Sequence, residues 1–384
     1  MDYPPLYYNL ACAYALNGRA KEALGWLRRT LAVGFYADAA RDADLDTLRT
    51  SEEFGEIVRG FASLYVPRGR ADTAFTLGER GLTVENVAFD PVTGTFYAGS
   101  IYRRKIVQRH PTGDVDDFVG PADNGLYSVL GMKVDASRRR LWVATAAEMT
   151  TGGLRPGELG RSSLLALEIP SGRLLKRLDL DTVLGAHLLN DLAVDGRGEV
   201  FVSDYLTGVI YRASVSSDSL EAFVPTVPTA NGITLSGDGR YLFVGTEREG
   251  IYRCDLRDRS LRRISAADTV SFFDIDGLYA VGRSLLAVQT AMNRVARFFL
   301  DSTLSRVDSV HILLSFHESF EMPTTGVVVG EEFFLVANCQ YNKFTPEGRL
   351  SSLERFNDTV ILRVKVGEAS PDRTPRGVRQ ELDR

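Results

Sequence analysis

The sequence predicts an all-β, six-bladed β-propeller preceded by a small α-helical segment. The first observation is a recurring phrase, in which one variable residue, called the slot, precedes a short buried strand, a turn and a second strand of β-branched or aromatic residues. It occurs six times, at Glu85, Leu130, Asn190, Asn231, Asp276 and Thr325. The second is the spacing, because successive slots are 45, 60, 41, 45 and 49 residues apart. Short strands repeating every 40–50 residues or so are typical of propeller blades.

The copy at Asn190 displays the phrase most clearly. Leu192–Val194 and Glu199–Ser203 flank an Asp-Gly-Arg-Gly turn, which predicts a β-hairpin. In a propeller, the equivalent position of every inner strand faces the central channel, so the six slots should form a ring. Two of its members are carboxylates and two are carboxamides. Such hard oxygen donors suit calcium.

Composition limits the classes of function. The chain has 384 residues and a formal charge of −5, enough for one large domain and an appendage. The mixed, mildly acidic charge favours neither nucleic acid nor a membrane surface. Its three cysteines are far apart and have no metal-binding spacing, so we expect buried thiols. We see no export signal or membrane-spanning run and expect a cytoplasmic protein, although a signal upstream of Met1 would lie outside this sequence.

Residues 1–66 form the predicted helical segment. Apolar residues recur at helical spacing between Tyr8 and Ala15, and Asn17-Gly18 ends that helix. A second helix is predicted over Arg19–Leu31. The helical character is predicted to continue at Phe35–Ala39 and from Ser51, which would cap the last helix.

The phrase from Tyr8 to Leu24 resembles a tetratricopeptide repeat, and Asp44–Phe54 resembles the segment that often closes such arrays. The resemblance covers about one and a half repeats, fewer than the three or so that a free-standing solenoid needs. The segment therefore packs on the propeller, pairs with another chain or ends a longer array. The helical segment is therefore either a cap that docks on the propeller or a surface that binds a protein partner.

The propeller is predicted over residues 70–366. Two strands, 74–77 and 359–366, are left over at its ends, and we expect them to share one blade because that arrangement removes exposed strand edges. The tail, 367–384, is rich in Pro, Asp and Arg and is predicted to be disordered.

The longest interval between slots contains a Gly-rich loop, residues 147–160. It follows the second strand of its blade, so the chain direction places it on the same side as the slots. Long loops in compact domains are often lids or binding loops, and others are simply mobile. We expect this one to lie over the channel mouth.

The order Glu85, Asn190, Asn231, Asp276 resembles the calcium-ligand positions of six-bladed propeller hydrolases: the gluconolactonase, senescence marker protein and paraoxonase-like superfamily. The resemblance spans about residues 72–366. It implies a catalytic calcium held by those four residues, and hydrolysis of a lactone or related ester. Metal-assisted attack by a carboxylate or an activated water would follow. Asp276 is the first candidate base or nucleophile, and Glu85 is the other.

The chain also departs from that pattern. Leu130 and Thr325 place no His or Arg in the ring. His187, three residues before Asn190, is the best candidate proton shuttle, and a loop histidine bonded to backbone is the alternative. A metal-free relative of the strictosidine-synthase type is disfavoured because all four oxygen donors are present. The alternative function is a non-catalytic, calcium-stabilised propeller that binds a ligand or a protein together with the helical segment.

Overall fold

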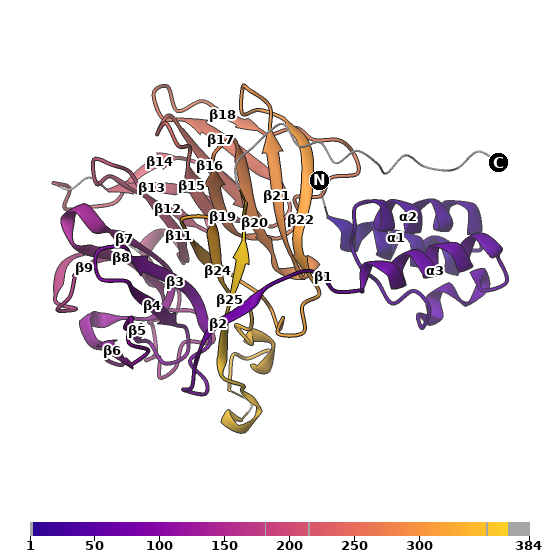
Figure 1. Cartoon of the computed structure of the whole chain (residues 1–384). Helices are drawn as coiled ribbons and strands as arrows, with labels where there is room; N and C mark the ends of the chain where they lie inside the picture. The colour runs from indigo at the N-terminus through magenta and orange to yellow at the C-terminus, as the bar shows by residue number, and fades with distance from the viewer. Residues whose placement is uncertain (1–2, 181, 214–215, 351, 368–384) are drawn as a thin grey trace.

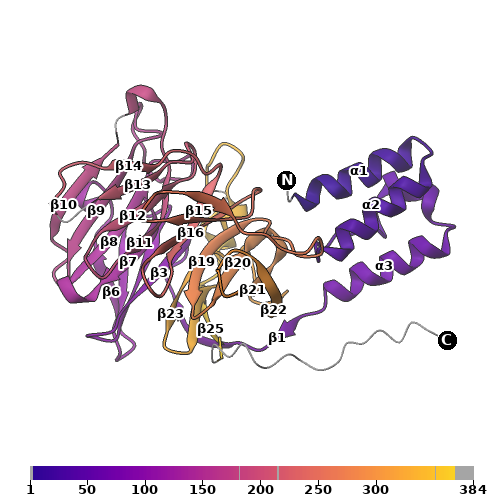
Figure 2. The same ribbon diagram turned by 90° about the horizontal axis from the view of Figure 1, so that it is seen from above.

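The computed structural model describes residues 3–180, 182–213, 216–350 and 352–367. Within these residues, six antiparallel sheets surround a channel, and a helical segment projects from one side (Figures 1 and 2). The predicted tail, 367–384, lies outside the described residues except for Gly367. The six-bladed propeller is confirmed.

Each blade runs outward from an inner strand that begins at a slot. Blade one contains β3 (Val84–Asp90), β4 (Thr95–Ser100), β5 (Ile106–Arg109) and β6 (Val115–Val119). Blade two contains β7 (Ser128–Asp135), β8 (Arg140–Ala146), β9 (Ser162–Glu168) and β10 (Leu174–Asp179). Blade three contains β11 (Leu189–Val194), β12 (Val200–Asp204), β13 (Ile210–Ala213) and β14 (Glu221–Val224).

The remaining blades follow the same order. Blade four contains β15 (Ala230–Leu235), β16 (Tyr241–Thr246), β17 (Ile251–Asp255) and β18 (Leu261–Arg263). Blade five contains β19 (Ile275–Val281), β20 (Ser284–Gln289), β21 (Arg294–Leu300), β22 (Val307–Ser315) and the short β1 (Arg68–Gly69). Blade six contains β23 (Gly326–Val329), β24 (Glu332–Val336), β25 (Thr359–Lys365) and β2 (Asp72–Leu77).

Blade six closes the ring as the sequence predicted. β2, from the start of the propeller, pairs antiparallel with β25 from its end, with Leu77 opposite Thr359. Apolar side chains of this blade and of blade one form one buried cluster that includes Leu77, Val87 and Ile361. The first and last strands of the propeller therefore belong to one sheet.

The helical segment consists of α1 (Pro4–Leu16), α2 (Ala20–Ala32), η1 (Ala43–Leu48) and α3 (Glu52–Leu64). Ser51 caps α3 as predicted, its hydroxyl accepting the Phe54 N–H at 3.4 Å. Single 3₁₀ turns lie in the propeller: η2 (Asp123–Gly125), η3 (Ala136–Arg138), η4 (Thr182–Leu184), η5 (Thr290–Met292), η6 (Tyr341–Lys343) and η7 (Leu353–Arg355). The likeness of the helical segment to a tetratricopeptide repeat stays a prediction.

The predicted helical character of residues 35–39 is wrong. This stretch has no helical turn because its aromatic side chains pack on blade five instead. Phe35 meets Phe273 with ring centroids 6.0 Å apart, and Tyr36 meets Phe316 at 5.9 Å. β1 also pairs with β22, which fixes the helical segment to the outer edge of blade five (Figure 1).

In blades one to five, the residue after the slot lies close to the inner strand of the next blade; in blade six, a Cβ on Gly326 would instead meet Phe333 and Phe334 of the same blade. In four blades that residue is glycine, namely Gly131, Gly232, Gly277 and Gly326. A Cβ on Gly131 would lie 2.3 Å from the carbonyl oxygen of Asn190. One on Gly232 would lie 2.6 Å from the carbonyl oxygen of Asp276. The absent side chain lets the slot of the next blade pack directly against the backbone.

The other two blades use buried polar side chains at the same position. Asn86 accepts the backbone N–H of Met132 in blade two at 3.2 Å. Asp191 accepts the backbone N–H of Ile233 in blade four at 3.1 Å. Both side chains are almost completely buried, so these inter-blade bonds are protected from water.

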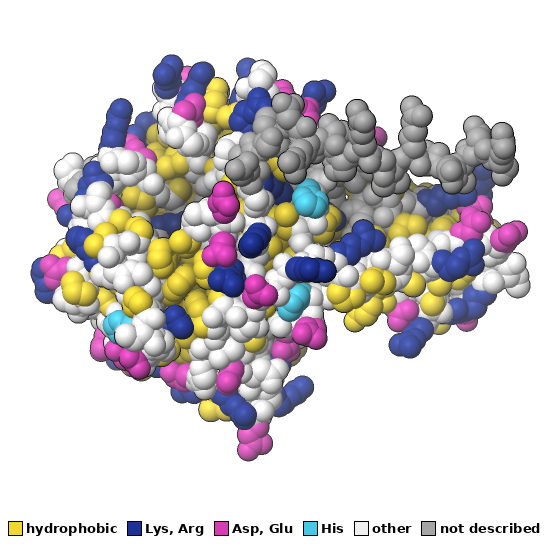
Figure 3. All heavy atoms as spheres, in the orientation of Figure 1, with side chains coloured by type: hydrophobic (Ala, Val, Ile, Leu, Met, Phe, Trp, Pro, Cys, Tyr) yellow, Lys and Arg dark blue, Asp and Glu magenta, His cyan; other side chains and the backbone are white. Residues whose placement is uncertain are grey.

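No helix among the described residues is long and apolar enough to cross a membrane. Acidic and basic side chains are interspersed over the face of the molecule seen in Figure 3.

Gly232→Ala should destabilise the propeller by about 1–3 kcal/mol, because the new Cβ meets backbone that cannot move independently. Gly237→Ala is the matched control in the same blade, since its Cβ would meet no atom within 4 Å. Urea unfolding of both variants measures the difference. Equal midpoints would contradict the close packing of the inner strands.

Candidate functional site

A cavity of about 310 Å³ lies at the slot end of the channel. Five of the six predicted slot residues line it, and all four predicted calcium ligands are among them. The remaining lining residues come from the loops above the inner strands. The slot residues are Glu85, Leu130, Asn190, Asn231 and Asp276.

A local irregularity positions each of these slot residues. The strand register shifts between Val84 and Asn86, so Glu85 is left without a ladder partner. The same shift occurs at Leu130, Asn190, Asn231 and Asp276. A bulged residue is free to turn its side chain out of the pleat, which here directs it toward the channel.

Blade six departs from this pattern. β23 begins at Gly326, and Thr324 rather than Thr325 lines the cavity. The Thr325 hydroxyl is 2.8 Å from the Glu85 carbonyl oxygen and accepts the Asn86 amide at 2.8 Å. The sixth slot therefore joins blade six to blade one, and its neighbour takes the place at the cavity.

Asp276 is held by its neighbours on two sides. Its Oδ1 accepts the side-chain amide of Asn231 at 2.9 Å, and its Oδ2 lies 3.2 Å from the Thr290 hydroxyl. Burial is the main cause, and the charge of Asp274 the second, that raises the pKa of Asp276 to about 7. The carboxyl thus exchanges its proton near neutral pH when no cation is present.

Glu85 lies on the same ring and is more deeply buried than Asp276, with 8% of its surface exposed. Burial raises the pKa of its carboxyl well above the usual range, and the negative charge of Asp276 adds to the shift. The thiol of Cys339 lies 3.3 Å from Glu85 Oε2 and donates to it. Burial and the Glu85 charge in turn raise the pKa of that thiol.

The donor set suits a hard divalent cation. The ring offers two carboxylates and two carboxamides to one cavity, and the carboxylates repel each other. Among the described residues, Asn231 Oδ1 is buried and accepts no hydrogen bond. A buried carbonyl oxygen without a donor is costly, and a cation in the cavity would satisfy it. These residues therefore fit the implied calcium.

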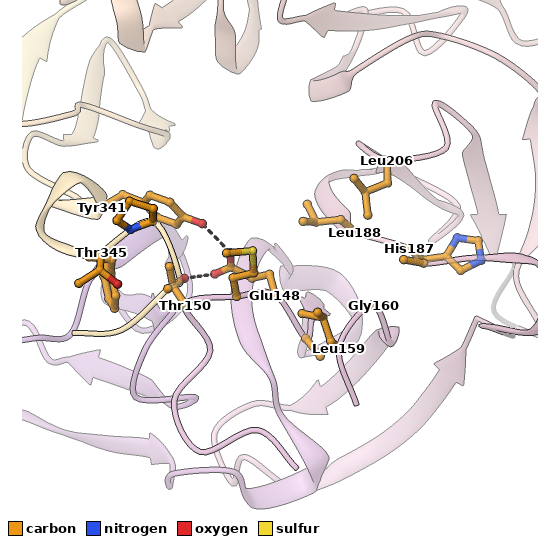
Figure 4. A pocket seen from close by; sticks show the side chains of 15 residues that line it. Glu148, Thr150, Leu159, Gly160, His187, Leu188, Leu206, Tyr341 and Thr345 are labelled. Carbon is orange, nitrogen blue, oxygen red and sulfur yellow. Dashed lines mark hydrogen bonds between the residues drawn. The ribbon is translucent and has the colours of Figure 1, made fainter. Parts of the chain in front are cut away.

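The structure places His187 away from this ring. Its Nδ1 lies 2.6 Å from Asp204 Oδ2, which is completely buried. His187 lines a neighbouring cavity, and Figure 4 shows its ring turned away from the space between the other side chains. The structure brings Glu85 and Asp276 to one cavity and leaves His187 outside it, so its role as a proton shuttle stays a prediction.

The Gly-rich loop reaches the cavity, as its chain direction predicted. Glu148 lines the ring cavity together with Tyr341, whose hydroxyl donates to Glu148 Oε2 at 2.6 Å. The sequence analysis singled out the loop but not Glu148. Cys339 and Tyr341 follow β24 outside the recurring phrase, so no repeat signal could identify them. Asp274 lies two residues before a slot and could have been found by inspecting that turn.

No model of a known protein family matches the chain, and no curated protein matches it either. Solved structures do share its fold. A gluconolactonase from Xanthomonas campestris superposes with a TM-score of 0.52 at 16% identity, covering 79% of this chain and 92% of that one. A luciferin-regenerating enzyme gives 0.52 at 13% identity, covering 78% and 95%.

A sugar dehydrogenase fold is equally similar. A putative oxidoreductase (glucose dehydrogenase) from Thermus thermophilus gives a TM-score of 0.54 at 14% identity, covering 77% of this chain and 99% of that one. At these identities the likeness is one of fold. The side chains of the ring therefore decide what the site can do.

The calcium-free protein should show a pH dependence of stability that Asp276 causes. Its folded pKa, about 7, lies above its ordinary value of 3.8. The folded state then keeps a proton that the unfolded state has lost, so stability falls as pH rises from 4 to 7. Asp276→Asn removes this titration, and the variant should gain on the order of 1–3 kcal/mol relative to wild type over that window.

Urea unfolding in EDTA between pH 4 and 8 measures this difference. Asp218→Asn is the control, because that side chain is fully exposed. A constant difference between wild type and Asp276→Asn across the range would show that the ring carboxyls do not interact as described.

Proposed function

We propose that the protein is a calcium-dependent hydrolase that acts on a lactone or related ester in the ring cavity. The observation that carries this proposal is the convergence of Glu85, Asn190, Asn231 and Asp276 on one cavity. The fold it shares with a gluconolactonase supports it. In the net reaction, water adds to the carbonyl carbon, the ester C–O bond breaks, and a carboxylate, a hydroxyl and a proton result.

Calcium, held by those four residues, would polarise the substrate carbonyl oxygen as a Lewis acid. The residues of the chain supply the remaining chemistry. Asp276 can accept a proton from water or attack the carbonyl carbon, and Asn231 and Thr290 orient its two oxygens. Glu85 is the alternative acting carboxylate. Its Oε2 accepts a hydrogen bond from the Cys339 thiol.

Part of the ring cavity is lined by apolar side chains. Leu130 and Ile101 line one side of the cavity and belong to a buried apolar cluster with Cys339. Apolar walls lower the local dielectric and strengthen the interaction of the ring with developing charge. The alternative is a non-catalytic platform, in which the same cation stabilises the propeller and the cavity holds a ligand without turnover.

Calcium should raise the melting temperature of the wild-type protein, and EDTA should lower it. A ligand bound only by the folded state stabilises it by about 2.7 kcal/mol at a hundredfold excess over its Kd. Asp276→Ala should abolish the difference. Asn231→Ala should reduce it less, because that change removes a neutral donor. Melting curves across a calcium titration measure all three.

A second cluster of potential ligands provides the control. Cys12, Asp42 and Asp44 in the helical segment have ligand atoms within 4.8 Å of one another. Asp44→Asn should leave the calcium shift unchanged. Loss of the shift in Asp44→Asn and its retention in Asp276→Ala would place the ion in the helical segment and remove the main support for the hydrolase.

Hydrolysis of simple lactones should require calcium and the ring carboxylates. We expect Asp276→Asn to lower kcat by at least about a hundredfold, the usual size of a lost general base, because the amide cannot accept the proton. Glu85→Gln should change calcium affinity more than kcat. The reverse pattern would identify Glu85 as the acting carboxylate. Binding of these lactones without turnover by the calcium-loaded protein would favour the platform.

A further inference from the structure

A second, larger cavity of about 610 Å³ adjoins the ring cavity. The two share three lining residues, Glu148, Leu188 and Tyr341. Three segments build the second cavity: the Gly-rich loop 147–160, residues 186–188 with Leu206, and the loop 341–348 (Figure 4). None of the six slot residues lines this second cavity.

The lining of this second cavity is mainly apolar, and its rim leaves large apolar side chains in contact with water. Met149 is 53% exposed, Leu159 60% and Leu206 54%. In Figure 4, Leu159, Leu188 and Leu206 lie across the cavity from Tyr341. Apolar side chains gathered around a hollow are typical of a ligand-binding groove.

The polar side chains of the lining are already engaged by the protein. Glu148 accepts hydrogen bonds from the hydroxyls of Tyr341 and Thr150. His187 is bound to Asp204. A ligand covered with hydroxyl groups would lose hydrogen bonds to water here and regain few, which disfavours it.

The walls of the cavity are fixed against one another. A Cβ on Gly348 would lie 2.2 Å from the carbonyl oxygen of Met149, so the loops 341–348 and 147–160 meet backbone to backbone. A Cβ on Gly160 would lie 2.6 Å from Ala186 Cβ, which brings the third segment to the same loop. The space is therefore formed before a ligand arrives, which lowers the cost of binding.

We propose that this cavity binds an aliphatic or aromatic arm of the substrate while the ester group lies in the ring cavity. The inference rests on the proposed function and specifies its substrate class: lactones or esters with a medium-length apolar substituent. The shared wall of Glu148, Leu188 and Tyr341 makes the two cavities neighbours, so one molecule can reach both. Polyhydroxylated lactones match the ring but not this second cavity.

Three six-membered lactones that differ only in their substituents test the proposal: δ-valerolactone, glucono-δ-lactone and δ-dodecalactone. We expect kcat/KM for δ-dodecalactone to exceed that for the other two by at least about tenfold, since each buried methylene favours binding. Leu159→Gln and Leu206→Gln should reduce that ratio severalfold. Val92→Gln is the matched control, because Val92 is 65% exposed in the turn at the opposite end of blade one.

Binding of the neutral fluorophore N-phenyl-1-naphthylamine separates the two proposals. It should bind the wild-type protein with or without calcium, more weakly in Leu159→Gln and Leu206→Gln, and unchanged in Val92→Gln. Equal kcat/KM for δ-valerolactone and δ-dodecalactone would overturn the apolar arm and leave the hydrolase standing. No hydrolysis of any lactone at millimolar calcium would overturn the hydrolase, and fluorophore binding unaffected by the leucine changes would overturn the cavity as an apolar site.

Discussion

The close approach of the inner strands at the channel is the constraint on which the rest of the structure depends. Five of the six slot residues sit at a bulge, and the residue after each of these five touches the next blade. Glycine permits that contact in blades such as the one starting at Asn231, while Asn86 and Asp191 make it through hydrogen bonds. The same packing that closes the propeller therefore aims the slot side chains at one point. Fold and site are consequences of one arrangement.

That arrangement concentrates negative charge where little water can reach it. Burial raises the pKa of both Glu85 and Asp276; the charge of Asp276 adds to the shift at Glu85, and the charge of Asp274 adds to the shift at Asp276, so each carboxyl is harder to ionise than in water. Left without a cation, the ring disfavours its own ionised form. The unsatisfied Asn231 Oδ1 adds to this cost. A divalent cation would relieve all three, which is why the ring is better explained as a binding site than as part of the core.

The sequence predicted the ring because it is repeated. Six copies of one phrase fix the register, and register alone brings Glu85 and Asp276 together although 190 residues separate them. The pairing of β2 with β25 followed from the two terminal strands that the six repeats left over. Residues outside the phrase gave no such signal. Cys339 and Tyr341 lie in a segment that has no counterpart in the other blades. Residues 35–39 are not helical because their aromatic side chains contact blade five, and only folding brings these groups together.

The second cavity, like Cys339 and Tyr341, is built from segments outside the repeated pattern. Its walls come from the loop 147–160, which is an insertion into one blade, and from the loop 341–348, which lengthens another. Because loops can change without altering the inner strands, substrate preference can vary on this fold while the ring is kept. Glu148 connects the two: it belongs to the insertion, yet it lines the ring cavity and accepts from Tyr341 of the other loop. A change in either loop would thus move the Glu148 carboxyl beside Glu85, so under the proposed function the choice of substrate and the electrostatics of the ring would be coupled through this one side chain.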